Sequence, residues 1–167
     1  MLETGTHKGR STQAISSALV ENDQGFMFTV DMDDYGCLND ALSDDEKGRV
    51  TRILGRSPGV FDHEPLKDLE KIDFAFLDGD HSGDVFRAEL EWIDAHRDTT
   101  CYVVIDNSLD EGWNEVREVL NSYNEYPRIS LETMCGLDMV CMLGPIRDRV
   151  NGEVSSGREQ EPVEAEE

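Results

Sequence analysis

The chain has 167 residues, of which 37 are acidic and 15 basic, so its formal net charge is −22. A chain of this length suits one domain with a real core, and it contains no apolar run near the roughly 18 residues that cross a bilayer. A strongly negative surface repels nucleic acid and anionic membranes, so we expect neither as a partner. The first residues carry no signal peptide and the four cysteines lack CxxC spacing, so we expect a soluble, cytoplasmic protein.

The acidic residues are distributed unevenly along the chain. The last seventeen residues hold six glutamates and one arginine, and the remaining charge of −17 is spread over the body. A solvated acidic surface with an acidic tail explains this pattern. Adaptation to a salt-rich cytoplasm explains it equally well, because screening suppresses repulsion between carboxylates. Composition leaves both interpretations open.

Apolar periodicity predicts alternating strands and helices from the first residue onward. A first strand ends at Leu2-Glu3 and is expected to be clipped, since a strand normally has about five or six residues. A helix follows over 11–22. Its apolar face is expected to consist of Ala14, Ile15, Ala18 and Leu19. Strands are predicted at 26–30 and 50–54, although residues 43–46 have the pattern of a helix cap and offer a helix in place of the second strand.

The second half of the chain continues this alternation. Its predicted strands and helices lie, in chain order, at 72–77, 84–97, 101–105, 112–124, 128–132 and 137–143. Strands that alternate with helices imply a largely parallel sheet covered on both faces. We therefore predict an α/β fold of three layers, α/β/α, in which a doubly wound, Rossmann-like, mostly parallel sheet ends in a C-terminal antiparallel hairpin strand. The domain is expected to span 1–146, followed by an acidic, disordered tail over 147–167.

Acidic residues stand at four successive strand ends. They are Glu3, Asp31, Asp78 and Asp106. One such residue is usually a cap or a turn residue, but in an open parallel sheet the carboxyl ends of the strands converge on the ligand site. Together, these acids predict a binding site.

The first strand is followed by a glycine-containing loop and then by a helix. Gly5 and Gly9 have the spacing G-x-x-x-G, which by itself is a weak signal and lacks the third glycine of the nicotinamide fingerprint. Glycines at such a turn let the backbone approach a ligand closely, beside the N–H groups of the helix.

These motifs resemble those of the class I S-adenosylmethionine-dependent methyltransferases. Glu3-x-Gly5-x-x-x-Gly9 is similar to the first motif of that superfamily, and Asp31 matches the acid that holds the ribose diol of the cofactor. Gly55-Arg56-Ser57 resembles the loop beside the adenine. The resemblance implies a cofactor site formed by Glu3, Gly5, Thr6, Gly9, Ser11, Thr12, Asp31, Met32, Gly55, Arg56, Ser57 and Asp78.

Two later segments narrow the resemblance to the divalent-metal-dependent O-methyltransferases, which include catechol, caffeoyl-coenzyme A and antibiotic-sugar methyltransferases. These segments are Phe74-Ala75-Phe76-Leu77-Asp78-Gly79-Asp80-His81 and Val103-Val104-Ile105-Asp106-Asn107. The resemblance implies that Asp78, Asp106 and Asn107 bind Mg²⁺, or alternatively Mn²⁺ or Ca²⁺, as hard oxygen ligands. The metal would lower the pKa of an acceptor hydroxyl, and His81, or Asp80 as the alternative, would act as the catalytic base.

The predicted function is thus metal-assisted O-methylation of a small hydroxylated acceptor, with a sugar-containing one favoured. Two alternatives stay open: a nicotinamide-dependent oxidoreductase, and a non-catalytic cofactor-binding or assembly module. From the resemblance, we expect the N-terminal helices that close over cofactor and acceptor in those families to be missing from this sequence. A homodimer is also left open. Trp92 and Trp113 are expected in the core, with acceptor contact as the alternative for Trp113, which follows the Asp106-Asn107 loop. His7 is expected on the surface of the first loop.

Overall fold

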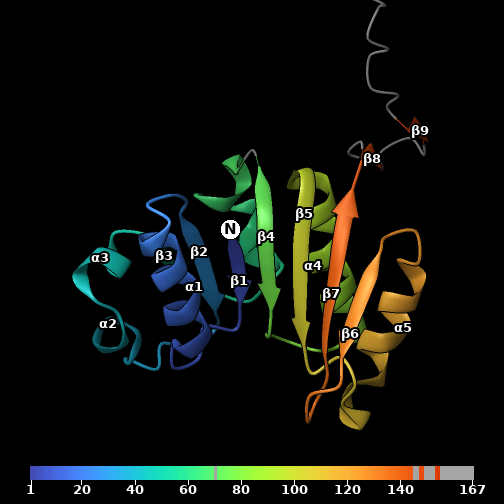
Figure 1. The fold of residues 1–167 in the computed structure, drawn as a ribbon, viewed down its shortest axis with the longest axis horizontal. Coiled ribbons are helices and arrows are strands. Elements are labelled where there is room, and N and C mark those ends of the chain that lie inside the picture. Colours follow the sequence, from blue (N-terminus) through green and yellow to red (C-terminus); the bar gives the residue numbers. More distant parts are fainter. Residues whose placement is uncertain (70, 145–146, 149–152, 155–167) are drawn as a thin grey trace, which may run out of the picture.

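A computed structural model describes residues 1–69, 71–144, 147–148 and 153–154 (Figure 1). Its main strands are β1 (Leu2–Thr4), β2 (Met27–Asp31), β3 (Val50–Leu54), β4 (Ile72–Leu77), β5 (Arg97–Asp106), β6 (Arg128–Leu131) and β7 (Leu137–Leu143). The helices are α1 (Arg10–Glu21), α2 (Leu38–Ala41), α3 (Asp44–Lys47), α4 (Gly83–His96) and α5 (Asn114–Ser122). Ser43 does cap a short helix, α3, but β3 forms as well, so the helix precedes the predicted strand and does not replace it.

The seven strands form one sheet in the order β3-β2-β1-β4-β5-β7-β6. The first five strands in this order run parallel to one another, whereas β7 runs antiparallel to both β5 and β6. This confirms the predicted Rossmann-like sheet with an antiparallel hairpin at its C-terminal end. The order reverses at β1, so the loops after β1 and β4 diverge there and leave room for a ligand.

The main hydrophobic core lies between the sheet and the helices behind it in Figure 1. Phe86, Leu90 and Ile93 of α4 are buried against the sheet, as their spacing predicted. Val116 and Leu120 of α5 join the same cluster. A layer of this kind holds the sheet rigid beneath the loops at its carboxyl edge.

Helix α1 covers the opposite face, and the prediction for its buried side was right for Leu19 but wrong for the alanines. Ala14 and Ala18 are exposed, Ile15 is half-buried, and the helix buries Thr12 and Ser16 beside Leu19. The reason is the polarity of the sheet beneath it. Glu3 points to this face and accepts a hydrogen bond from the Thr12 hydroxyl at 2.6 Å, so the helix turns a polar side chain inward.

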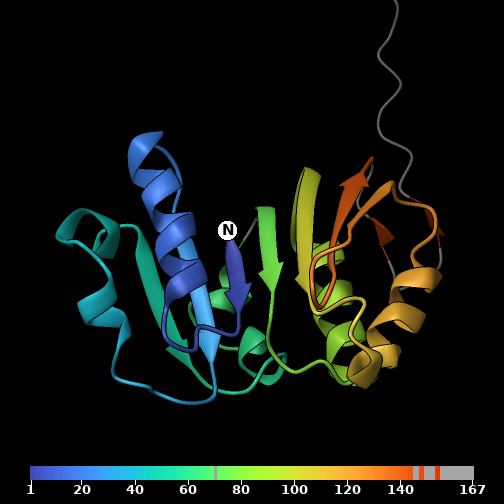
Figure 2. The ribbon, with the colours of Figure 1, turned by 60° about the horizontal axis from the view of Figure 1, so that its bottom comes forward.

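The same sheet face continues beyond α1 without a helix over β4, β5, β7 and β6 (Figures 1 and 2), as far as the described residues go. Strand register places the following apolar residues on it: Phe74, Phe76, Tyr102, Val104, Leu137, Met139, Cys141, Leu143, Ile129 and Leu131. Tyr102, Ile129, Leu131 and Leu143 are about half exposed. The predicted three-layer arrangement is therefore complete on only one face. The homodimer stays a prediction.

A buried ion pair links the end of α4 to the start of β5. Arg97 Nε donates to Asp94 Oδ1 at 2.8 Å, and the Tyr126 hydroxyl donates to the same oxygen at 2.9 Å. Arg97 also donates to the carbonyl of Gly144 at 2.9 Å. Because Arg97 and Asp94 are almost fully buried, each relies on the other to stay charged away from water.

The C-terminal end is described only in part. Of the predicted tail over 147–167, the structure describes β8 (Arg147–Asp148) and β9 (Glu153–Val154), which form a two-residue antiparallel pair. The rest of the tail lies outside the described residues, so its disorder stays a prediction. Among the described helices, none is long and apolar enough to cross a membrane.

Candidate active site

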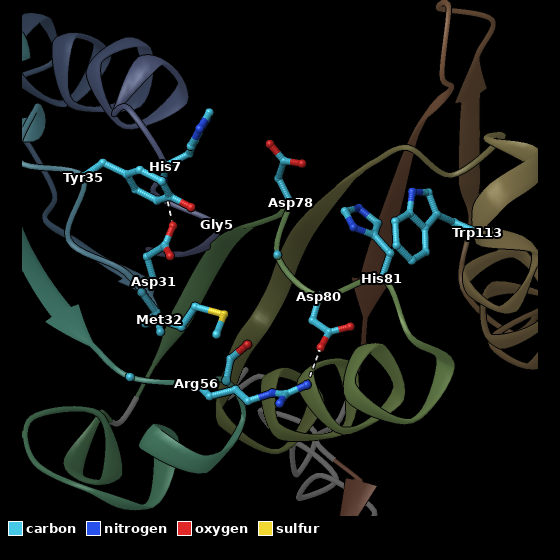
Figure 3. A pocket seen from close by; sticks show the side chains of 14 residues that line it. Gly5, His7, Asp31, Met32, Tyr35, Arg56, Asp78, Asp80, His81 and Trp113 are labelled. Atoms are coloured by element: carbon cyan, nitrogen blue, oxygen red, sulfur yellow. Dashed lines mark hydrogen bonds and ion pairs between the residues drawn. The ribbon is translucent and has the colours of Figure 1, made fainter.

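A cavity of about 410 Å³ opens at the carboxyl ends of β1, β2, β3 and β4 (Figure 3). This volume lies within the usual range for small-molecule sites. Its walls consist of Gly5, His7, Val30, Asp31, Met32, Tyr35, Gly55, Arg56, Ser57, Asp78, Gly79, Asp80, His81 and Trp113. The predicted convergence of strand ends therefore produces a real concave site.

Nine residues expected in the site line this cavity. They are Gly5, Asp31, Met32, Gly55, Arg56, Ser57, Asp78, Asp80 and His81. The loop after β1 passes so close to β4 that a Cβ on Gly5 would lie 2.0 Å from the Asp78 carbonyl oxygen. With φ at +90°, Gly5 also has a backbone conformation that other residues rarely adopt. A glycine is therefore required there.

Five residues predicted to bind the cofactor lie outside the cavity wall. They are Glu3, Thr6, Gly9, Ser11 and Thr12. Glu3 is fully buried, and its Oε2 accepts hydrogen bonds from Thr12 at 2.6 Å and Thr29 at 2.5 Å. Burial raises the pKa of Glu3. Glu3 thus ties β1, β2 and α1 together beneath the first loop.

Four of the lining residues were not proposed as binding groups, and a fifth, Trp113, was expected mainly in the core. The four are His7, Val30, Tyr35 and Gly79. Trp113 is 40% exposed and lies against His81, with ring centroids 5.3 Å apart. Trp113 precedes the first residue of α5, so it does not lie on the buried face of that helix. Its nearness in sequence to Asp106 was the one available signal.

Asp31 holds the wall of the cavity formed by β2 and the first loop. Its Oδ2 accepts from the backbone N–H of His7 at 2.7 Å, and its Oδ1 accepts from that of Asp33 at 3.0 Å. The ring of His7 packs edge-on against Tyr35, 4.7 Å away (Figure 3). Each carboxylate oxygen keeps a lone pair for a ligand, so Asp31 can accept two further hydrogen bonds.

Asp78 and Asp106 end the neighbouring strands β4 and β5, and their charges interact. Burial, and then the negative charge of Asp106, raises the pKa of Asp78 to about 6. A nearby cation would relieve this repulsion. Asp106 and Asn107 lie outside the cavity wall. Within the described ranges, no three His, Cys, Asp or Glu side chains are grouped closely enough to hold a metal ion. A metal site formed by Asp78 and Asp106 would therefore need Asn107 as its third ligand.

His81 and Asp80, the two candidate bases, have different surroundings. The Nε2 atom of His81 lies 3.3 Å from the carbonyl oxygen of Asp106. A carbonyl only accepts, so Nε2 is the donor in this hydrogen bond, and in a neutral ring the lone pair is then on Nδ1. Asp80 accepts from the Ser82 N–H at 3.0 Å and from Arg56 at 2.8 Å (Figure 3). These hydrogen bonds lower the pKa of Asp80, which makes it a weaker base.

Glu89 lies beneath this site on α4 and is 1% exposed. Burial raises its pKa from an ordinary 4.5 to about 7. Between these values the folded protein holds a proton that the unfolded chain has released, so the free energy of unfolding falls as pH rises from about 4.5 to about 7. Above pH 7 the ionised form destabilises the fold by about 3 kcal/mol.

Replacing Glu89 by glutamine is expected to remove this pH dependence. E89Q should be more stable than the wild type at pH 8 and nearly equal to it at pH 4.5, as measured by urea denaturation. Glu118→Gln, at an exposed position on α5, is the matched control and should shift stability little at either pH. If E89Q raised the free energy of unfolding more at pH 4.5 than at pH 8, Glu89 would not be the buried group with the raised pKa.

The sheet order and the acid-lined cavity at its reversal define a class I S-adenosylmethionine-dependent methyltransferase fold. A family model described as a methyltransferase domain matches residues 2–108, and the chain belongs to that family. This membership decides against the nicotinamide alternative. No curated protein matches the sequence.

Several solved structures share the fold. The O-methyltransferase TomG from Streptomyces achromogenes, in complex with S-adenosylmethionine, is 19% identical with a TM-score of 0.72, over 86% of this chain and 72% of its own. An O-methyltransferase from Bacillus cereus with S-adenosylhomocysteine is 18% identical with a TM-score of 0.68, over 84% and 72%. CalS11, a TDP-rhamnose 3'-O-methyltransferase of calicheamicin biosynthesis, is 16% identical with a TM-score of 0.64, over 84% and 70%.

Proposed function

We propose that this chain transfers the methyl group of S-adenosylmethionine to a hydroxyl of a small acceptor, assisted by a divalent cation. The observation that carries the proposal is the acid-lined cavity at the point where the sheet order reverses, next to the Asp78–Asp106 pair. The cofactor is a sulfonium with an amino group and no phosphate. Carboxylates attract such a molecule and would repel a pyrophosphate.

The cofactor would lie across the loops after β1, β2 and β3. The open lone pairs of Asp31 suit the two adjacent hydroxyls of a ribose, and the glycine at position 5 lets the backbone approach the ligand. The loop at 55–57 would border the adenine. The sulfonium end would then lie toward Asp78 and His81 (Figure 3).

The residues at the ends of β4 and β5 fit a divalent cation. Asp78, Asp106 and Asn107 offer two carboxylates and one amide, the oxygen ligands that Mg²⁺, Mn²⁺ or Ca²⁺ prefer. A cation there would lower the pKa of an acceptor hydroxyl. We propose that His81 takes the hydroxyl proton at Nδ1, supported by its hydrogen bond to the Asp106 carbonyl, while Asp80 stays paired with Arg56.

The acceptor would enter beside Trp113. This indole is exposed at the rim of the cavity and lies next to His81 (Figure 3). Aromatic faces pack against the apolar C–H face of a sugar ring, so Trp113 supports a sugar-containing acceptor. The 3'-O-methylation of TDP-rhamnose named for CalS11 is consistent with this choice.

Replacing Asp31 by alanine is expected to weaken S-adenosylmethionine binding roughly 10- to 100-fold, because two hydrogen bonds to a charged group are lost. Isothermal titration calorimetry measures the change. Asp33→Asn is the control: Asp33 lies two residues away and outside the cavity wall, and its substitution should leave the Kd nearly unchanged.

The titration and a methyl-transfer assay together test the proposed function. If the wild type fails to bind S-adenosylmethionine below millimolar concentration, the proposed function is wrong. Binding without methyl transfer to any hydroxyl acceptor in the presence of Mg²⁺ would favour the non-catalytic module instead. Methyl transfer that EDTA abolishes and Mg²⁺ restores would support the metal-assisted reaction.

A further inference from the structure

Glu89 occupies a position that costs stability and that the reaction itself does not use. It is buried on α4, and its Oε1 accepts a hydrogen bond from the hydroxyl of Ser57. Ser57 in turn lines the cavity, in the loop proposed to border the adenine. A carboxyl group kept at the expense of stability, and connected to a ligand-facing hydroxyl, indicates a functional role.

The direction of that hydrogen bond determines what Ser57 offers a ligand. A serine hydroxyl has one proton and two lone pairs, whereas an ionised carboxylate only accepts. Above about pH 7, where Glu89 is ionised, the Ser57 proton is therefore directed at Glu89, and the lone pairs of Ser57 remain for the cavity. Arg56, the charged residue of the same loop, is directed at Asp80 (Figure 3). Ser57 thus presents an acceptor to whatever base lies beside it.

We propose that Glu89 is a positioning residue that fixes Ser57 as a hydrogen-bond acceptor for the 6-amino group of adenine, so that the site selects an aminopurine over an oxopurine. The inference rests on the proposed function, since it places the cofactor in this cavity. An oxopurine presents an oxygen at position 6, and two acceptors facing each other leave both without a donor.

Calorimetric titration of the whole chain at pH 8 with S-adenosylhomocysteine and S-inosylhomocysteine tests this selection. We expect the wild type to bind the adenosyl compound at least about 10-fold more tightly. In E89Q the amide can donate to Ser57, which releases the serine proton, so the preference should fall below about 3-fold. Ser57→Ala should lose the preference equally, and the double variant should lose no more than either single one.

A pH series separates positioning from a general structural effect. Besides burial and Ser57, the Thr4 hydroxyl and the negative charge of Asp80 also influence the pKa of Glu89. A protonated Glu89 can donate a hydrogen bond, as glutamine can. The wild-type preference for the adenosyl compound should therefore become smaller as the pH falls from 8 to 6, while the preference of E89Q should not change with pH. Glu118→Gln should keep the full wild-type preference and its pH dependence.

Equal weakening of both ligands in E89Q, with the preference intact, would overturn the positioning role. A wild-type preference that is flat with pH would overturn it as well, and this readout holds even if E89Q does not fold. If neither ligand binds the wild type, the proposed function fails, which is a different result from binding both without discrimination.

Discussion

Replacing Asp106 by alanine is expected to reduce methyl transfer at least about 100-fold at saturating Mg²⁺, while the Kd for S-adenosylmethionine changes less than about 3-fold. Asp106 lies outside the cavity wall but acts on the Asp78 carboxyl, so its removal should affect the proposed metal site and spare the cofactor site. Single-turnover methyl transfer and calorimetric titration on the same preparation measure the two effects.

Two comparison variants make the Asp106 result specific. Asp106→Glu keeps the charge and should retain more activity than alanine, especially at high Mg²⁺. Asp84→Asn removes an exposed acid in the first turn of α4 and should leave both measurements near wild type. Unchanged turnover in the alanine variant would rule out a metal role for Asp106.

Replacing Asp94 by alanine is expected to lower the free energy of unfolding by about 3–5 kcal/mol. The buried Arg97 charge would then lose the Asp94 carboxylate, and the hydrogen bond from the Tyr126 hydroxyl to that carboxylate would be lost with it. Urea denaturation followed by circular dichroism measures the loss. The Asp94→Leu/Arg97→Met double variant should recover most of it, because two apolar side chains leave no buried charge behind.

The surface pair Arg49–Asp23 is the matched control for the buried one. Its two side chains lie 2.6 Å apart, but Asp23 is almost completely exposed. Water competes for both charges, so Asp23→Asn, which keeps a residue type that tolerates the positive φ of this position, should change stability by about 1 kcal/mol or less. Equal losses for Asp23→Asn and Asp94→Ala would show that burial does not determine the strength of the Arg97–Asp94 pair.

Local sequence pattern predicted the strands and helices well where burial follows spacing. The i, i+4, i+7 spacing of Phe86, Leu90 and Ile93 identified the buried side of α4 because an apolar sheet lies beneath it. The same rule failed for the alanines of α1. There the sheet presents Glu3, and the helix turns Thr12 toward it and leaves Ala14 exposed. Spacing alone does not reveal the polarity of the surface that a helix will meet.

The residues of the candidate site were likewise predictable only where local pattern determines their position. Acids at strand ends could be located from the sequence because parallel strands bring their carboxyl ends to one edge, which placed Asp31 and Asp78 in the cavity wall. Trp113 was expected in the core, since its place in an apolar pattern does not reveal that α5 begins just after it. Glu89 gave no signal either, because its link to Ser57 joins residues 32 positions apart.

The sequence by itself determined the alternating α/β order, the acidic strand ends and the resemblance to methyltransferases. Each of these depends on local spacing or on short motifs, which can be recognised from residues that lie close together in the sequence. Only the tertiary structure decided which acids are exposed to a ligand, which are buried as braces like Glu3, and which pair with an arginine like Asp80. These roles depend on burial and on partners from distant segments, and the environment of a carboxylate, rather than its presence, sets its pKa and its chemistry.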